Sequence, residues 1–395
     1  MKSLLILVRT EGDFERAIAL GIAAKNDFEL TFVFVGDFSP FYNDGIKNIF
    51  QKKLFKKYGF EILDFSEFDL VGKYTRKLLR AKKVTLDNVR KKEASIFKFF
   101  LFKIFERSVY NNKENIIKKL IKEISPTYLF TDQSKTEPNY LPEEIRQVAL
   151  KVNIPVYIFT HGSSGGLHSE FSKPIFNPYN GYTVCACNTN ETQSEFSNRI
   201  ITGDFASSYP YVHFINGLEI EDISFLDDKK YKVGIFVGGT GPLTSTTGAL
   251  RLQEIIIDLS ENEDVAMVLK LHPRDVFPDL RMLKEFKNLL IVAGETDRSR
   301  VTKWADILIC TDASSVVFEP MILGKKVVAV EGKHVPSFKN HHSPLINSSA
   351  TFISNPIEFD LEILSEADPL DDVTDKIAWG SNGKQDLAKI FLNKL

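Results

Sequence analysis

The sequence predicts an α/β protein built from two doubly wound domains that face each other across a cleft. Short apolar runs of strand type alternate with helical patterns along the chain, and this alternation restarts near residue 230. A glycine-containing turn follows the first strand of each half, at Gly12 and at Gly238–Gly241. The length of 395 residues also suits two domains of ordinary size.

The first domain is expected over residues 1–215. An apolar run at 3–8 is followed at once by a helical pattern, which is the usual opening of a doubly wound domain. Further strands are expected at 30–35, 60–63, 127–132, 155–160, 182–188 and 200–204, and a helix at 143–151. The boundary is expected between residues 204 and 229, where Pro210, Gly217 and an acidic run break the pattern.

The second domain is expected over residues 216–395. Its strands are predicted at 231–237, 265–271, 289–292, 307–310 and 326–330, and its clearest helices at 248–259 and 316–323. Each later strand is preceded by helix-like sequence, so these strands should form a parallel sheet.

Composition restricts the class of protein. Apolar residues make up 43% of the chain and charged residues 26%, which excludes disordered, collagen-like and coiled-coil proteins. The three cysteines, Cys185, Cys187 and Cys310, lie in apolar runs and predict neither a disulfide framework nor a zinc site. The amino terminus lacks the length of a secretory signal, and no run approaches the roughly 20 apolar residues of a membrane span. A cytoplasmic protein is therefore expected.

A basic segment interrupts the alternation between Lys47 and Lys122. It holds 21 Lys or Arg against 8 Asp or Glu, an excess of +13 that leaves −15 for the rest of the chain. Apolar residues, many of them Phe, recur in it at helical spacing opposite a lysine-rich face. We interpret most of this segment as peripheral helices with Phe in the core and Lys in water. For Lys91 to Arg107 we favour a helix on an anionic membrane surface.

A cluster of basic residues surrounds a His-Pro dipeptide after the strand at 265–271. Proline fixes the backbone turn, so the side chain of His272 is held in one direction before Pro273. His272 can donate to a phosphate oxygen, while Lys270 and Arg274 add positive charge. The competing interpretation is a histidine that caps a strand end. The cluster as a whole favours phosphate binding.

A second polar segment, Asp312-Ala313-Ser314-Ser315, precedes the helix expected at 316–323. Free backbone N–H groups and the positive end of the helix dipole make such a place an anion site, and two hydroxyls add donors. Asp312 or Ser314 can equally serve as a plain N-cap. Glu319 follows Ser315 by one helical turn and can take the two hydroxyls of a ribose, or simply face solvent.

Three further groups complete the candidate site. Gly239 and Thr240 belong to a glycine turn that lets the backbone approach a ligand, although it matches neither a Walker loop nor a dinucleotide fingerprint. Glu11, Asp13 and His161 follow strands of the first domain and can each supply a general base across the cleft. No motif has metal-ligand spacing, so metal dependence is not expected.

The His-Pro and Ser-Ser segments resemble the carboxyl-terminal domain of GT-B glycosyltransferases. Polysialyltransferases and other sialyltransferases, capsule Kdo transferases and the CDP-glycerol polymerases of teichoic acid synthesis carry such motifs to hold the donor phosphate. Here the motifs are His272-Pro273 and Ser314-Ser315. The resemblance covers about the last third of the chain and extends to the first half only through architecture. There, His161-Gly162 is similar to a His-Gly of the teichoic acid enzymes.

This resemblance implies a metal-independent enzyme without a cofactor. It would move a sugar, with CMP-activated sialic acid or Kdo favoured, to a hydroxyl of a capsule, lipopolysaccharide or related glycan or glycolipid acceptor at the inner face of the membrane. The donor would bind the second domain and the acceptor the first. Glu11 ranks first as the base, before His161 and Asp13. His272, Arg274 and the serine hydroxyls would neutralise the leaving phosphate.

Three other functions fit the same sequence features. A CDP-glycerol or polyol phosphotransferase would use the same motifs on a different donor. A hydrolysing UDP-sugar 2-epimerase shares the architecture and a similar late serine-containing motif, and it needs no acceptor. A non-catalytic partner of a polysaccharide export complex could keep the fold without activity. Nucleic acid is not an expected partner.

Overall fold

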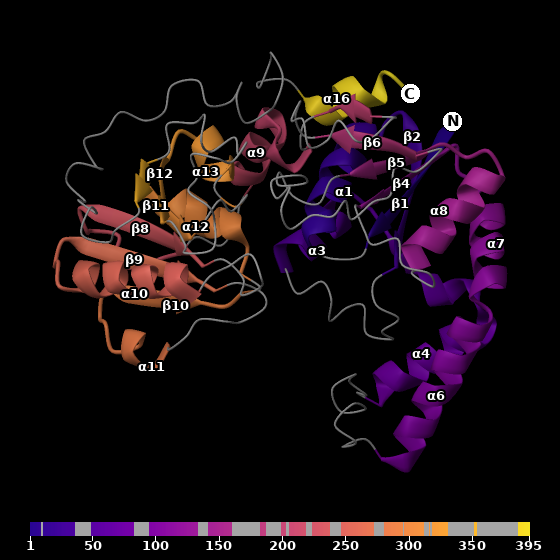
Figure 1. The fold of residues 1–395 in the computed structure, drawn as a ribbon, viewed down its shortest axis with the longest axis horizontal. Coiled ribbons are helices and arrows are strands. Elements are labelled where there is room, and N and C mark those ends of the chain that lie inside the picture. The colour runs from indigo at the N-terminus through magenta and orange to yellow at the C-terminus, as the bar shows by residue number, and fades with distance from the viewer. Residues whose placement is uncertain are drawn as a thin grey trace.

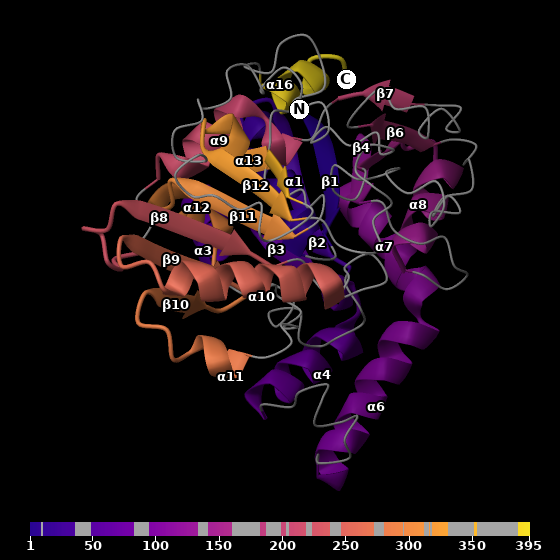
Figure 2. The same cartoon turned by 60° about the vertical axis from the view of Figure 1, so that its left-hand side comes forward.

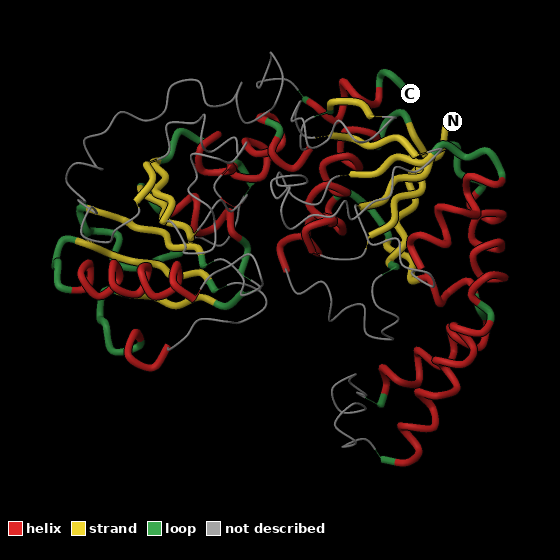
Figure 3. The backbone as a smooth tube through the Cα atoms, in the orientation of Figure 1, coloured by secondary structure: helices red, strands yellow, loops and turns green. Residues whose placement is uncertain are grey.

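The computed structural model describes residues 1–8, 11–35, 49–82, 95–132, 141–159, 182–186, 199–202, 205–218, 223–237, 246–271, 280–294, 296–311, 316, 318–330, 351–353 and 386–395. Two parallel sheets, each packed between helices, form two domains (Figures 1 and 3). The predicted fold class, α/β with two doubly wound domains, is confirmed.

The first sheet has the strand order β3-β2-β1-β4-β5-β6-β7, and its strand pairs are parallel. The chain builds outward from β1 to β3 and then returns to place β4 on the other side of β1. The point between β1 and β4 is therefore the topological switch of this sheet. The strands are β1 (Lys2–Val8), β2 (Phe28–Phe34), β3 (Ile62–Asp64), β4 (Tyr128–Asp132), β5 (Val156–Phe159), β6 (Tyr182–Ala186) and β7 (Arg199–Ile201).

Both faces of the first sheet are buried, because side chains alternate along β1 and each set meets its own helices. Leu4 and Ile6 join a core cluster with residues of α1 and α3, whereas Leu5 and Leu7 join one with residues of α7 and α8. The elements outside the sheet are α1 (Glu11–Ala24), α3 (Ile49–Lys57), η1 (Phe65–Phe68), α4 (Leu70–Ala81), α6 (Ile96–Asn111), α7 (Lys113–Ile124), α8 (Leu141–Lys151) and η3 (Phe205–Ser207).

The second sheet repeats this plan with the order β10-β9-β8-β11-β12-β13. Its switch point lies between β8 and β11, which are parallel neighbours. α10 covers one face, while α12 and α13 cover the other. The elements are β8 (Tyr231–Phe236), α10 (Thr246–Ser260), β9 (Val265–Lys270), α11 (Leu280–Leu283), β10 (Leu289–Val292), α12 (Arg298–Trp304), β11 (Ile307–Thr311), α13 (Phe318–Ile322), β12 (Lys326–Val330) and β13 (Thr351–Ile353).

The end of the chain lies on the first domain, although it was expected in the second. Helix α16 (Leu387–Leu392) buries Phe391 against Phe130, Tyr157 and Phe205, with ring centroids 5.8, 5.5 and 5.6 Å apart. The two termini also meet, since Lys2 Nζ donates to the Leu395 carbonyl at 2.7 Å (Figure 1). Residues 387–395 thus complete the core of the first domain.

The expected boundary region contains a helix, α9 (Tyr209–Asn216), where the sequence suggested a break. Pro210 stands in the first turn of α9, a position at which the missing N–H costs no hydrogen bond, so it starts the helix. Val212 of α9 belongs to the core of the second domain, and Ile215 to that of the first. α9 therefore connects the two cores.

The basic segment divides between two environments. Leu54, Phe55, Leu101 and Phe105 are buried in the first domain, as expected for peripheral helices. Other apolar residues of α4 and α6 are exposed on a pair of helices that projects from the body (Figure 2). Within the described part of the chain, every helix is too short or too polar to cross a bilayer.

Candidate functional site

Three strands of the second sheet end side by side. Phe236 near the end of β8 pairs with Lys270 of β9 and with Cys310 of β11. Because β8 and β11 flank the switch point, this edge is the place where an open parallel sheet binds its ligand. The segments that the sequence proposes for donor binding follow these three strands directly.

Most of the proposed donor-binding residues lie outside the described residues. These are Gly239 and Thr240 after β8; His272, Pro273 and Arg274 after β9; and Asp312, Ser314 and Ser315 after β11. The strands that precede them end in register at one edge. Their contacts with a donor stay predictions.

Lys270 is described, and its ammonium points into the domain. The residue is buried, and Nζ donates to the carbonyls of Gly294 at 2.9 Å and Leu271 at 3.3 Å. These bonds join the end of β9 to the segment after β10. The predicted role of Lys270 toward a phosphate is untested, and in this arrangement its ammonium holds backbone in place.

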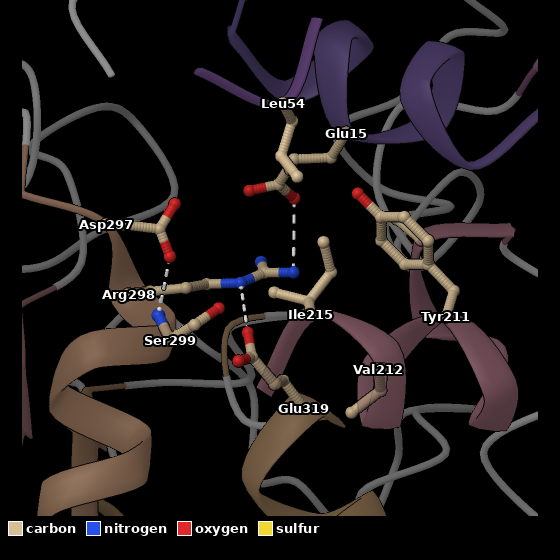
Figure 4. Close-up of a pocket in the computed structure, with 10 residues that line it drawn as sticks. Glu15, Leu54, Tyr211, Val212, Ile215, Asp297, Arg298, Ser299 and Glu319 are labelled. Carbon is tan, nitrogen blue, oxygen red and sulfur yellow. Dashed lines mark hydrogen bonds and ion pairs between the residues drawn. The ribbon is translucent and has the colours of Figure 1, made fainter. Parts of the chain in front are cut away.

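An ion cluster joins the two domains beside this edge. Arg298 Nη2 lies 3.1 Å from Glu15 Oε2 of the first domain, and Arg298 Nε donates to Glu319 Oε2 of the second at 2.7 Å (Figure 4). Glu319 Oε1 also accepts from Asn216 Nδ2 at 3.0 Å. We call Glu15, Arg298 and Glu319 the interdomain ion cluster.

Each member of this cluster is presented by the start of a helix that follows a strand. Asp297 caps α12 through a 2.9 Å bond from the Ser299 N–H, which places Arg298 at the first position of the helix. Glu15 lies in α1 after β1, and Glu319 in α13 after β11. Since α12 follows β10, the carboxyl edges of the two sheets face each other here.

The cluster carries more negative than positive charge. Burial raises the pKa of Glu15, and the carboxylates of Asp297 and Glu319 raise it further, although Arg298 opposes both. Burial alone would lower the pKa of the Arg298 guanidinium. The nearby carboxylates of Glu15 and Glu319 have the larger effect, so this pKa is raised. Glu319 is 4% exposed, while the side chains of Glu15 and Arg298 keep 24% and 22% exposure. The guanidinium thus stays charged while Glu15 is biased toward protonation.

A small cavity lies next to the cluster. Its volume is about 20 Å³, and its lining includes Tyr211 and Ile215 of α9. The Tyr211 hydroxyl points toward Glu15 (Figure 4), and burial together with the Glu15 charge raises the Tyr211 pKa well above its ordinary value. Such a volume admits water but no nucleotide. The cavity therefore belongs to the contact between the domains.

The structure gives Glu319 partners that the sequence did not predict. Both carboxylate oxygens already accept hydrogen bonds, from Arg298 and Asn216. The residue is also only 4% exposed, and its role toward a ribose stays a prediction. Sequence analysis missed Arg298 and Glu15, because nothing in either segment indicates that it meets the other domain. Asp297 is a typical N-cap residue and could have predicted where α12 starts, but it could not have predicted that Arg298 pairs with Glu15.

The candidate bases of the first domain are only partly placed. Glu11 and Asp13 occupy the first turn of α1, and Glu11 precedes Glu15 by one turn of this helix. The helix start that reaches the second domain is thus the segment in which the sequence expected a base. His161 lies outside the described residues.

Comparison with known proteins identifies the fold. No protein-family model and no curated protein matches the sequence. Solved structures match along almost the whole chain. UDP-GlcNAc 2-epimerase from Methanocaldococcus jannaschii, in complex with UDP-GlcNAc and UDP, is 12% identical with a TM-score of 0.60, over 100% of this chain and 99% of that one.

Two further structures show the same likeness. A putative UDP-N-acetylglucosamine 2-epimerase from Listeria monocytogenes is 11% identical with a TM-score of 0.59, over 99% of this chain and 95% of that one. UDP-GlcNAc 2-epimerase from Neisseria meningitidis bound to UDP-GlcNAc is 12% identical with a TM-score of 0.57, over 100% and 99%. At such identities the likeness establishes the shared fold, which is the two-domain GT-B arrangement.

Proposed function

We propose that this chain is an enzyme acting on a nucleotide-activated sugar that binds where the carboxyl edges of the two sheets face each other. The interdomain ion cluster is the observation that carries the proposal. Its contact at 3.1 Å between Glu15 and Arg298 brings the helix starts behind β1 and β10 together. In folds of this kind, ligands bind at the switch points on that edge.

The reaction we favour is hydrolytic 2-epimerisation of a UDP-sugar. Support comes from the likeness of both domains, over nearly the full chain, to enzymes whose names specify UDP-GlcNAc as substrate. Two of these structures contain UDP-GlcNAc, and one of the two also contains UDP. The CMP donor expected from the motifs depends on the sequence resemblance alone.

The chemistry assigns roles to the candidate residues. Breaking the bond between sugar and nucleotide leaves negative charge on the phosphate, and His272, Arg274 and the serine hydroxyls are the groups proposed to neutralise it. A base must take the proton that leaves C2 as the bond between C1 and the phosphate breaks. Water then supplies the hydroxyl at C1 and the proton that returns to C2 in the opposite configuration. Glu11 ranks first for this role, followed by His161 and Asp13. Closure of the domains would exclude water until it is needed.

A second candidate function is transfer of the sugar to a glycan or glycolipid hydroxyl. The specific observation in its favour is the pair of motifs, His272-Pro273 and Ser314-Ser315, with their resemblance to polysaccharide glycosyltransferases. The same residues would then hold a CMP- or CDP-activated donor. This hypothesis places the enzyme in the cytoplasm, at the inner face of the membrane where such acceptors are made.

A donor panel separates these functions. The full chain is incubated with CMP-, CDP- and UDP-activated sugars, with and without a glycan acceptor, and both released nucleotide and the configuration of the sugar are measured. UDP released without acceptor, together with the 2-epimeric free sugar, supports epimerisation. Release that depends on acceptor supports transfer. No release from any donor would contradict both enzymatic hypotheses.

His272→Ala tests the phosphate site. We expect turnover of the active donor to fall by roughly 10²–10⁴-fold, because the leaving phosphate loses a proton donor and a positive group. The thermal unfolding midpoint should stay that of the wild type. His213→Ala is the matched control, since His213 is an exposed histidine of α9. Wild-type turnover in His272→Ala would remove this residue from the site.

A further inference from the structure

Helices α4 and α6 form an arm that projects away from both domains (Figures 1 and 2). Where the helices cross, a Cβ added at Gly72 would lie 2.9 Å from Val109 Cγ2, so a glycine permits the close approach. At the base of the arm, Arg76 forms a buried ion pair with Asp64 at 2.6 Å. The arm, defined as α4 and α6 together, is therefore firmly attached to the first domain.

The arm gathers most of the exposed apolar side chains of the described residues. Among all the described residues, thirteen large apolar side chains are exposed, and nine of these thirteen belong to the arm. They are Leu70, Val71, Tyr74, Leu78, Ile96, Phe97, Phe99, Phe100 and Ile104. Such a concentration marks an interaction surface, whereas scattered apolar residues do not.

Each helix of the arm has buried apolar residues and exposed ones, which we call its outer residues, and on α6 most of the outer residues lie in the first turns. On α6, Leu101 and Phe105 are buried in the core, while Ile96 is 90% exposed and Phe97 and Phe100 are each 62% exposed. The outer residues therefore contribute nothing to the core of the domain. Their burial against a partner would remove this apolar surface from water.

Charge indicates which partner the arm fits. Apart from Arg76, which is buried and paired with Asp64, the two helices hold six Lys or Arg residues and a single acidic residue, Glu106, which gives a net charge of +5. A second copy of the arm would repel it, and lysine is depleted in protein interfaces. Aromatic and aliphatic residues mixed with lysines are instead typical of surfaces that enter the headgroup region of anionic bilayers.

We propose that the arm docks this protein on a membrane that contains anionic lipid. Phe97, Phe100 and Ile96 enter the boundary between headgroups and acyl chains, and the flanking lysines contact lipid phosphates. The proposal extends the sequence-based hypothesis for Lys91 to Arg107, of which residues 91–94 lie outside the described residues, because α4 contributes a second apolar stripe to the same arm. It stands apart from the proposed reaction, since binding requires no sugar donor.

Vesicle cosedimentation of the full chain tests the proposal. We expect binding to phosphatidylcholine vesicles containing about a third phosphatidylglycerol, and much weaker binding to phosphatidylcholine alone. Phe97→Ser with Phe100→Ser should lower the affinity at least roughly tenfold. Lys73→Gln with Lys77→Gln and Lys98→Gln should lower it by about fivefold for each lysine that approaches the surface.

Matched control variants distinguish docking through the arm from non-specific attraction of the whole protein to vesicles. Leu250→Ser with Met282→Ser replaces exposed apolar residues of the second domain, and Lys118→Gln with Lys119→Gln and Lys122→Gln removes the same charge from α7. Both controls should retain most of the binding. Equal losses in control and arm variants, or no vesicle binding by the wild type, would overturn the proposal. A dimer in sedimentation that Phe97→Ser with Phe100→Ser converts to monomer would assign the arm to a second copy instead.

Discussion

Among the described residues, Arg298 connects the two domains electrostatically, because its guanidinium pairs with Glu15 of the first domain and Glu319 of the second. Glu15 lies in the first domain and Glu319 in the second, and Asp297 adds a third negative charge nearby. Pairing in a partly buried place compensates for the lost hydration of these charges only if every partner is present. The cluster is thus sensitive to any change of charge among its members.

Glu15→Gln should reveal this sensitivity through pH. The folded-state pKa of Glu15 is raised above 4.5, so the folded protein holds that proton more tightly than the unfolded chain does. The stability due to Glu15 is therefore complete below about pH 4.5 and declines as the pH rises through the folded pKa. Glutamine resembles the protonated form. The stability of Glu15→Gln relative to the wild type should accordingly increase with pH, as measured by denaturant unfolding.

Glu114 of α7 serves as a control, because its pKa is shifted in the opposite direction to that of Glu15. The hydrogen bond and charge of Lys118 lower the pKa of the exposed Glu114, so its contribution is present above pH 4.5 and disappears as the pH falls through the folded pKa. Glu114→Gln should lose stability relative to the wild type as the pH rises. If Glu15→Gln also lost stability relative to the wild type as the pH rises, the ion pair with Arg298 would have a larger effect on the pKa of Glu15 than burial has.

Among the secondary-structure elements, α16 shows how a distant segment completes a core. Its N-cap Asp386 accepts from the Lys389 N–H at 3.1 Å, so local sequence explains the helix itself. Its packing depends on aromatic residues of β4, β5 and η3, far earlier in the chain. The last helix is therefore a structural part of the first domain.

Phe391→Ala tests this role. Phe391 is 2% exposed among aromatic rings, and its truncation should destabilise the first domain by roughly 3–5 kcal/mol, through lost burial and the cavity left behind. The measurement is chemical or thermal unfolding of the full chain. Phe97→Ala is the matched control, since Phe97 is exposed on the arm and should change stability by less than about 0.5 kcal/mol. Equal effects of the two substitutions would contradict the placement of α16.

For the molecule as a whole, the proposed function depends on how the two domains meet. The interdomain contacts include the ion cluster and the cores that α9 joins through Val212 and Ile215. A donor bound at this edge would touch both domains. Closure of the two domains over the donor would therefore change these interdomain contacts. The arm lies elsewhere, on the outer part of the first domain (Figure 2). The proposed membrane docking and the proposed domain closure therefore involve separate parts of the molecule.

Arg298→Met tests the contact between the domains. It leaves Glu15 and Glu319 facing each other without a cation, which should weaken the interface by roughly 1–3 kcal/mol. Hydrogen exchange should accelerate in α9, α12 and the start of α13, and stay unchanged in the central strands β1 and β8. Arg107→Met is the matched control, because Arg107 is exposed on α6. Unchanged exchange in α12 and α13 would show that other contacts hold the domains together.

The amino-acid sequence alone determined the fold class and most of the strands. Apolar runs such as Val265–Lys270 and Ile307–Thr311 specify strands locally, and their alternation with helices implies parallel sheets. It also marked the basic segment as an unusual surface, whereas its prediction of Glu319 as a donor-binding residue stays a prediction. These features depend on residues that are close together in the chain.

Tertiary structure alone decided the strand order, the partners of Glu319 and the place of the last helix. Periodicity reveals which face of an element is apolar, but it carries no information about which distant element covers that face. Arg298 meets Glu15 because two domains approach each other, and Phe391 meets Phe130 because the chain returns to its first sheet. Contacts of this kind join residues hundreds of positions apart, and only the packing of the whole chain brings them together.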